Sequence, residues 1–244
     1  MGGLLDLKRS VFDALQSARA AKRAVIVATA LKNGRQAIID GDKAEGDLPL
    51  SETISAAARR ALRDDKSHTI ETEAGPVFVQ AFNPPLRMLV VGAVHIAQAL
   101  APIAVTAGYE VTLIDPRRSF ATAARFPGVT LTHEWPDEAM DRLKLNARTA
   151  VVTLTHDPKI DDPALERALR SDCFYIGCLG STRTHKARLA RLAEHGFGEK
   201  DFARIHGPVG LDIGAKSPAE IAISIVAEIT AVLRREPEAA AAAA

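Results

Sequence analysis

Cysteine and aromatic residues are scarce in this chain, which has 244 residues but only two cysteines and 5% aromatic residues. A single cysteine pair in a chain of this length excludes a disulfide-stapled scaffold. Cys173 and Cys178 lie in one apolar segment, and no closely spaced His and Cys cluster of the zinc-binding kind is present. We therefore predict a cytoplasmic protein and no metal site.

Excess charge and long apolar runs are also missing. The formal net charge is +1, which argues against the broad basic surface that nucleic-acid binding requires. No apolar run approaches the roughly 18 residues of a membrane span, and the N-terminus lacks a signal-peptide core. We expect neither a nucleic-acid partner nor a membrane span, and we expect the patternless tail, residues 237–244, to be disordered.

Two common catalytic signatures are absent as well: the G-x-S-x-G elbow and the G-x-x-x-x-G-K-[ST] phosphate loop. The catalytic residues, if there are any, cannot be named from the sequence. Cysteines such as Cys173 and Cys178 are more often buried apolar fillers than nucleophiles. Cys178 is the better candidate for a reactive thiol, because it follows the strand and nearby basic residues would lower its pKa.

The pattern present in residues 1–84 predicts a small α+β domain. Asn33-Gly34 is a hairpin signal, Ser51 is a candidate helix cap, and the Asn-Pro-Pro string at 83–85 is a stiff break. A domain boundary is therefore expected after residue 84. The expected elements are helices within 9–23 and 51–66, strands at 24–31 and 36–40, and two strands within 67–82.

Residues 85–236 alternate continuous apolar runs with helical patterns, which predicts a Rossmann-like, doubly wound parallel sheet. A last helix, 221–233, is apolar nearly all round and is expected to be buried. The expected strands are 88–91, 110–114, 129–132, 150–154 and 173–177, with helices at 95–107, 119–125, 136–144, 162–171 and 182–195.

Ligands of such sheets bind beyond the carboxyl ends of the strands, so the residues after each strand are the ones to inspect. The first of these turns reads G-A-V-H-I-A where a dinucleotide fingerprint reads G-x-G-x-x-G. Gly92 keeps the tight turn, but Val94 places a branched side chain where a pyrophosphate would press against backbone. His95 either contacts a different ligand or caps the strand end. NAD in its usual pose is therefore disfavoured.

Asp115 follows the second strand, 23 residues after Gly92. This is close to the spacing at which an acidic residue accepts a hydrogen bond from a ribose hydroxyl. Arg117 and Arg118 could suit a phosphate instead, and a plain turn is the third interpretation. The fourth strand ends in Thr155-His156-Asp157, whose His-Asp pair could act in acid/base work, bind metal or orient a ligand, or could be a plain polar loop end.

Two glycine-containing loops complete the candidate site. Gly177 and Gly180 lead into a helix capped by Ser181 or Thr182, whose first turns carry Arg183, His185 and Lys186. Backbone N–H groups at a helix start attract anions, and these cations add to that attraction. Asp212 and Gly214 lie in a later loop before a Ser-Pro-x-Glu capping box. The full set of predicted cofactor-binding residues is Gly92, Val94, His95, Asp115, Thr155, His156, Asp157, Gly177, Gly180, Ser181, Arg183, Asp212 and Gly214.

The strings "VVGAVHIAQALAPIA", "YIGCLGSTRTHKARLARL" and "GPVGLDIGAKSPAEIAISIVAEI" resemble the XdhC/CoxI (CoxF) family of xanthine dehydrogenase accessory proteins. The resemblance covers about 87–235. It implies a maturation factor that binds molybdenum cofactor, assists its sulfuration and delivers it to an apo molybdenum hydroxylase of the xanthine or carbon monoxide dehydrogenase type. A cysteine desulfurase would be a further partner, and a homodimer is a further expectation.

The N-terminal block departs from that family. Family members usually carry a Ser-x-Pro-Arg type string and a Gly-Gly-Cys-Val-Glu type string there, whereas residues 1–84 contain neither, and no cysteine. This puts cofactor sulfuration by this chain in doubt. Two other hypotheses stay open: an NAD(P)-dependent oxidoreductase with His95 or His156 as proton donor, and a non-catalytic partner-binding protein.

Overall fold

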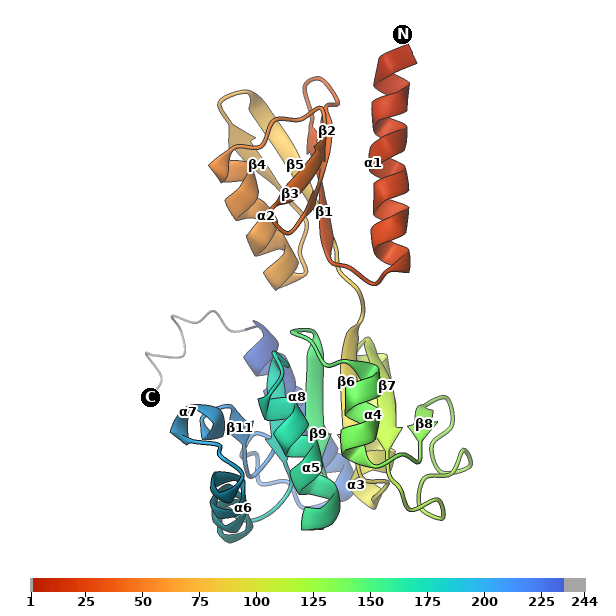
Figure 1. Cartoon of the computed structure of the whole chain (residues 1–244), viewed down its shortest axis with the longest axis vertical. Helices are drawn as coiled ribbons and strands as arrows, with labels where there is room; N and C mark the ends of the chain where they lie inside the picture. The colour runs from red at the N-terminus through yellow and green to blue at the C-terminus, as the bar shows by residue number, and fades with distance from the viewer. Residues whose placement is uncertain (1, 235–244) are drawn as a thin grey trace. The chain divides into compact units, whose positions relative to one another are not determined.

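The structure is a computed structural model that describes residues 2–234, with side chains from residue 9 onward. The chain forms two compact units, divided between Pro84 and Pro85, and each is described by itself (Figure 1). The expected disorder of 237–244 concerns residues outside this range.

The first unit is a five-stranded antiparallel sheet in the order β3-β2-β1-β5-β4, with one helix on each face (Figure 1). Alternation along β1 explains both layers: Val25 and Val27 pack against α1, whereas Ile26 and Ala28 pack against α2. Ser51 caps α2 by accepting a hydrogen bond from the N–H of Ile54. The elements are α1 (Gly2–Ala20), β1 (Val25–Ala30), β2 (Gln36–Asp40), β3 (Lys43–Gly46), α2 (Glu52–Asp64), β4 (His68–Thr72) and β5 (Gly75–Phe82).

The second unit is a six-stranded parallel sheet in the order β11-β10-β9-β6-β7-β8, which confirms the predicted doubly wound fold. The chain reverses its direction of winding between β6 and β9. The elements are β6 (Leu86–Val91), α3 (His95–Thr106), β7 (Tyr109–Ile114), β8 (Thr130–Thr132), α4 (Pro136–Leu143), β9 (Thr149–Thr153), α5 (Pro158–Leu169), β10 (Tyr175–Cys178), α6 (Thr182–Glu194), α7 (Glu199–Phe202), β11 (Ile205–His206) and α8 (Pro218–Arg234).

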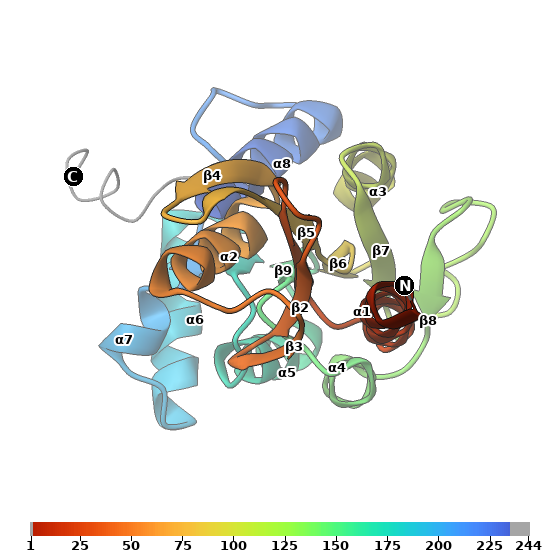
Figure 2. The same ribbon diagram turned by 90° about the horizontal axis from the view of Figure 1, so that it is seen from above.

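Helices cover both faces of this sheet. α3 and α8 lie side by side on one face, and α4, α5 and α6 lie on the other (Figure 2). Met88 and Val90 of β6 pack toward the first pair, and Leu89 and Val91 pack toward the second group. Burial on both faces is the reason why these strands read as continuous apolar runs.

Three predictions were wrong in detail, and three short elements were missed. Residues 119–125 form turns instead of a helix, because Ala121 and Phe126 anchor an irregular connection that ends at Pro127-Gly128. α5 begins four residues earlier than expected, since Asp157 and Pro158 supply an N-cap and a first-turn proline. α8 is buried along one face only, and Ile223 is 51% exposed. The short elements β3, α7 and β11 were not predicted.

The core around α3 gives a direct test of this packing. Leu100 is fully buried, whereas Val105 of the same helix is 48% exposed. We expect Leu100→Ala to lower the free energy of unfolding of the second unit by about 2–5 kcal/mol, because it leaves a cavity. Val105→Ala should change it by about 0.5 kcal/mol or less. Urea unfolding followed by circular dichroism measures both, and equal effects would contradict the assigned core.

Candidate functional site

The loops that follow β6, β7, β9 and β10 gather at the carboxyl edge of the parallel sheet. The reversal between β6 and β9 makes this edge the expected ligand site of a doubly wound fold. The turn after β6 contacts the turn after β7 through Ala93 and Asp115, and the turn after β9 through Gly92 and Thr155.

Gly92 occupies a position that only glycine fits. Its φ is 108°, and a Cβ built there would lie 2.4 Å from Cγ2 of Thr155. The turn after β6 therefore touches the turn after β9 at the point where the winding reverses. Next along the chain, Val94 is the N-cap of α3 but makes no side-chain cap hydrogen bond. The first N–H groups of α3 are thus left for solvent or an anionic ligand.

Asp115 is fully buried, and its carboxylate is occupied by the protein itself. It accepts hydrogen bonds from the N–H of Ala93 (2.8 Å) and from the N–H, Nε and Nη2 of Arg117 (2.9, 2.9 and 2.8 Å). The expected role of ribose-hydroxyl acceptor does not fit this arrangement. Arg117, 35% exposed and stacked on Phe120 at 4.7 Å, is the group left accessible.

The charge balance around Asp115 follows from these contacts. Burial raises the pKa of the Asp115 carboxyl, but the hydrogen bonds from Arg117 and Ala93 outweigh it and hold that pKa below its usual value. The same bond to Asp115, opposed by burial, raises the pKa of Arg117, and Asp157 and Asp161 raise it further. Arg117, after the second strand, is therefore attracted by the carboxylates of Asp157 and Asp161, after the fourth strand.

The turn after β9 is organised by Asp161, a residue that the sequence did not single out. Asp157 caps α5 by accepting from the N–H of Lys159 at 3.0 Å. Asp161, in the first turn of α5, is buried and accepts from the backbone N–H groups of Thr155 (3.3 Å) and His156 (3.0 Å). The imidazole of His156 is exposed. The sequence did carry one signal for Asp161, because an acidic residue in the first helical turn follows the helix-starting pair Asp157-Pro158.

The turn after β10 leads into α6 through a glycine with a positive φ and a capping serine. Gly180 has a φ of 145°, and Ser181 caps α6 by accepting from the N–H of Thr184 at 3.2 Å. Arg183 and Lys186 are exposed.

Arg188, which the sequence analysis missed, is only 2% exposed and donates from Nη2 to the carbonyl of Leu179 at 2.9 Å. Its Nε and Nη1 have no hydrogen-bond partner among residues 2–234. The sequence alone does not indicate this burial, because Arg188 is one of several cations in a basic helix.

Gly177 does not belong to this loop, which corrects the prediction. It lies within β10, where a Cβ would come within 2.5 Å of Cγ2 of Val209 and 2.8 Å of the ring of Tyr175. Its role is to admit those two side chains. The loop after β11 is held by α8 and not by the other turns. Glu228 of α8 accepts hydrogen bonds from the N–H of Gly210 in this loop (2.8 Å) and from Tyr175 Oη of β10 (2.5 Å).

Asp212 and Gly214 lie further along that loop, and both are exposed. Gly214 has a φ of 72°, with open space where a Cβ would be. The loop leads to Ser217, whose Oγ accepts from the N–H of Glu220 (3.3 Å), while Glu220 accepts from the N–H of Ser217 (2.8 Å). The predicted capping box is thus formed. The described contacts do not join Asp212 to the turns after β6, β7 and β9.

Comparison with known proteins places this geometry in a family. Residues 88–229, more than half of the chain, match the XdhC Rossmann domain. The chain belongs to the XdhC family. Its expected resemblance and its Rossmann-like fold are thereby confirmed.

Three curated relatives extend the comparison of this XdhC chain. An uncharacterized Escherichia coli protein, YqeB, is 33% identical over 66% of this chain and 30% of its own length. The E. coli molybdenum cofactor insertion chaperone PaoD is 30% identical over 66% of this chain and 44% of its own. A probable xanthine dehydrogenase subunit from Bacillus subtilis is 31% identical over 65% and 46%. The XdhC chain thus spans less than half the length of these relatives.

A solved structure shows the same fold. The crystal structure of a xanthine dehydrogenase from Bacillus halodurans superposes with a TM-score of 0.69 at 24% identity. The match covers 95% of this XdhC chain and 67% of that chain.

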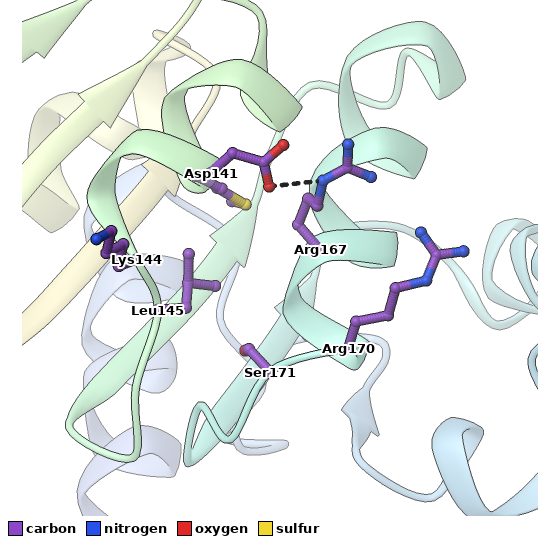
Figure 3. A pocket seen from close by; sticks show the side chains of 7 residues that line it. Asp141, Lys144, Leu145, Arg167, Arg170 and Ser171 are labelled. Carbon is purple, nitrogen blue, oxygen red and sulfur yellow. Dashed lines mark hydrogen bonds and ion pairs between the residues drawn. The ribbon is translucent and has the colours of Figure 1, made fainter.

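A cavity of about 520 Å³ lies away from the carboxyl edge, between the C-terminal ends of α4 and α5 (Figure 3). Arg167 donates to Asp141 across it at 2.8 Å, and Lys144 and Arg170 line it from the two helix ends. Because helices of this fold end where the next strand begins, the cavity is at the opposite edge of the sheet. It contains none of the predicted site residues.

Within residues 2–234 of the XdhC chain, no group of three or more His, Cys, Asp or Glu side chains is placed to hold a metal ion. In the same range, no helix combines the length and apolar character needed to cross a membrane.

The hypothesis of a reactive Cys178 is wrong in its physical premise. The thiol is fully buried, and burial raises its pKa to about 12 although the Arg188 guanidinium acts in the opposite direction. Burial likewise raises the pKa of Cys173. Nearby cations in the sequence could not reveal this, because desolvation exceeds their effect.

Both cysteines should therefore be unreactive in the folded XdhC chain. At pH 8 we expect an aromatic disulfide reagent to modify neither thiol within minutes, and both after denaturation in guanidinium chloride. Absorbance of the released thiolate gives the count. One equivalent released from the folded protein would contradict the assigned burial.

The depressed pKa of Asp115 predicts a pH-dependent contribution to stability. A carboxyl whose pKa is lower when folded stabilises above its unfolded value, about 3.9, and loses that contribution as pH falls through the folded value. The gap in free energy of unfolding between wild type and Asp115→Asn should therefore be largest near pH 7 and narrow below about pH 4. Exposed Asp172→Asn is the control, and a gap that is constant with pH would contradict the assignment.

Proposed function

We propose that this XdhC chain binds molybdenum cofactor, or its nucleotide form, and assists its insertion into a molybdenum hydroxylase. The observation that carries the proposal is the carboxyl edge of the sheet, where three contacting turns present exposed cations and helix starts. The cofactor is cargo here, and its redox chemistry serves the enzyme that receives it. The name of the relative PaoD, a molybdenum cofactor insertion chaperone, supports the same direction.

The residues present fit an anionic pterin or nucleotide. The start of α3 has no side-chain cap, and the close-packed glycine Gly92 precedes it. Arg117 is held in a fixed orientation by Asp115, and Arg183 is exposed in the first turn of α6. Phosphate oxygens are the natural partners of such N–H groups and guanidinium groups. His156 is exposed beside them to contact the pterin.

Sulfur transfer is assigned to a partner in this proposal. Both thiols of the chain are buried, so neither offers a reachable sulfur acceptor. A cysteine desulfurase would supply sulfur to the bound cofactor directly, and the apo hydroxylase would then receive it. The homodimer and the cytoplasmic location remain predictions.

The dehydrogenase hypothesis is less well supported. An NAD-type site needs an acidic side chain that is free to accept from ribose hydroxyls. The oxygens of Asp115 are already engaged by Ala93 and Arg117. Val94 adds a branched side chain at the turn where the pyrophosphate would lie. Nothing in the described site favours nicotinamide over another anionic ligand.

A titration separates the hypotheses. We expect molybdenum cofactor, released anaerobically from a donor protein, to bind with micromolar or better affinity, and NAD⁺ and NADP⁺ to bind at least tenfold more weakly. Arg183→Ala should weaken cofactor binding by about tenfold, which corresponds to about 1.4 kcal/mol. Arg170→Ala, which removes an exposed cation from the opposite edge, should leave the affinity unchanged.

Other outcomes are equally informative. Tight nicotinamide binding would favour the oxidoreductase. Loss of affinity in Arg170→Ala but not in Arg183→Ala would move the site to the cavity of Figure 3. Capture of an apo hydroxylase without any ligand binding would leave a partner-binding protein and overturn the proposal.

A further inference from the structure

His156 has an unusual backbone conformation for its place in the fold. Among the described residues other than glycine, four have a positive φ: Lys22, Asp65, Lys144 and His156. The first three follow the ends of α1, α2 and α4, where the left-handed conformation is an ordinary helix ending. His156, with a φ of 63°, instead precedes a helix, at the end of β9. Such a conformation persists only when the surroundings impose it.

Asp161 supplies the constraint. Its Oδ2 accepts from the backbone N–H of His156 at 3.0 Å, and its Oδ1 accepts from Oγ1 of Thr155 at 2.7 Å and from the N–H of Thr155 at 3.3 Å. One buried carboxylate thus holds Thr155 and His156, the residue with the positive φ. The methyl group of Thr155 is held against Gly92 by the same contacts.

Arg188 connects this carboxylate to the next loop. Its Nη2 lies 3.9 Å from Oδ2 of Asp161 and donates to the carbonyl of Leu179, just before Gly180. Burial raises the pKa of Asp161, while the hydrogen bonds from Thr155 and His156 and the charge of Arg188 oppose that rise. Asp161 and Arg188 therefore link the turns after β9 and β10 beneath the surface.

We propose that Asp161 is a positioning residue of the ligand site, which holds His156 in its left-handed conformation and so directs the exposed imidazole, with Arg188 as its partner. The identity of the ligand rests on the proposed function, but the positioning itself does not. Neither residue is exposed enough to be a first contact for a ligand. Their effect on binding is transmitted through Thr155 and His156.

The neighbouring residue provides a matched control. Asp162 has a side chain that is 14% exposed and accepts from Nε and Nη2 of Arg191 at 2.5 and 3.0 Å. That pair joins the same two helices, α5 and α6, without touching the turn after β9. Asp162→Asn therefore removes an ion pair from the same interface, one more exposed than that of Asp161 and Arg188, and Asp161→Asn removes the positioning contacts.

Amide hydrogen exchange in the ligand-free protein is the first measurement. We expect the amides of Thr155 and His156 to exchange at least tenfold faster in Asp161→Asn, and to be unchanged in Asp162→Asn. Thr155→Val, which keeps a methyl group against Gly92 but loses the hydroxyl, should give a smaller change in the same direction if Asp161→Asn does not fold. Unchanged exchange, or equal acceleration in Asp162→Asn, overturns the proposal.

A rescue experiment tests the strain. Glycine adopts a positive φ without cost, so His156→Gly should recover part of the melting temperature that Asp161→Asn loses. It should not recover cofactor affinity, because the imidazole is gone. If the double variant melts no higher than Asp161→Asn alone, the carboxylate does not hold a strained turn and the proposal fails.

Cofactor affinity is the last measurement. Asp161→Asn is expected to weaken binding of molybdenum cofactor about tenfold, measured at a temperature at which both variants are folded, whereas the affinity of Asp162→Asn stays at the wild-type value. Equal affinities in the two variants overturn the role in the ligand site. If the wild type binds no cofactor, the proposed function fails, and the exchange and rescue results still decide the positioning role.

Discussion

The carboxyl edge depends on one close approach, that of the Gly92 backbone to the methyl group of Thr155. No other residue type leaves room for that methyl group, and the positive φ of Gly92 independently favours glycine. Two buried carboxylates secure the contact from its two sides: Asp115 through the N–H of Ala93, and Asp161 through Thr155. The reversal of winding is therefore a packed and hydrogen-bonded joint, and the loops that could meet a ligand are arranged around it.

This joint also sets the turn apart from a dinucleotide-binding fingerprint. In a dinucleotide-binding domain the acidic residue after the second strand is kept available for the ligand. Here Asp115 is used inside the protein, and Arg117 is the accessible group in its place. The turn after β7 thus presents a guanidinium instead of a free carboxylate. Under the proposed function, a phosphate-bearing cargo suits this guanidinium better than a ribose would.

Much of the fold could be predicted from the sequence because its signals are local. Strands buried on both faces leave apolar runs, and Ser181 caps its helix within three residues. The position of Asp161 in the first turn of its helix could be predicted, but its contacts and those of Arg188 could not, because they cross from helix to loop and from one helix to another. The sequence left a reactive Cys178 open beside the favoured buried filler for a related reason: nearby cations can be read from a sequence, but the desolvation that outweighs them depends on the packed structure. Gly177 was misplaced because its neighbour Val209 is distant in the chain.

The contact of Glu228 with Gly210 and Tyr175 has a consequence for the order in which the protein is completed. All six strands precede α8 in the chain, yet the loop after β11 is fastened by a carboxylate from that helix. During synthesis, the sheet can assemble while this loop is still untethered. Only when α8 has left the ribosome and docked beside α3 can the Glu228 carboxylate fasten that loop, so this part of the fold is completed after the strands it follows.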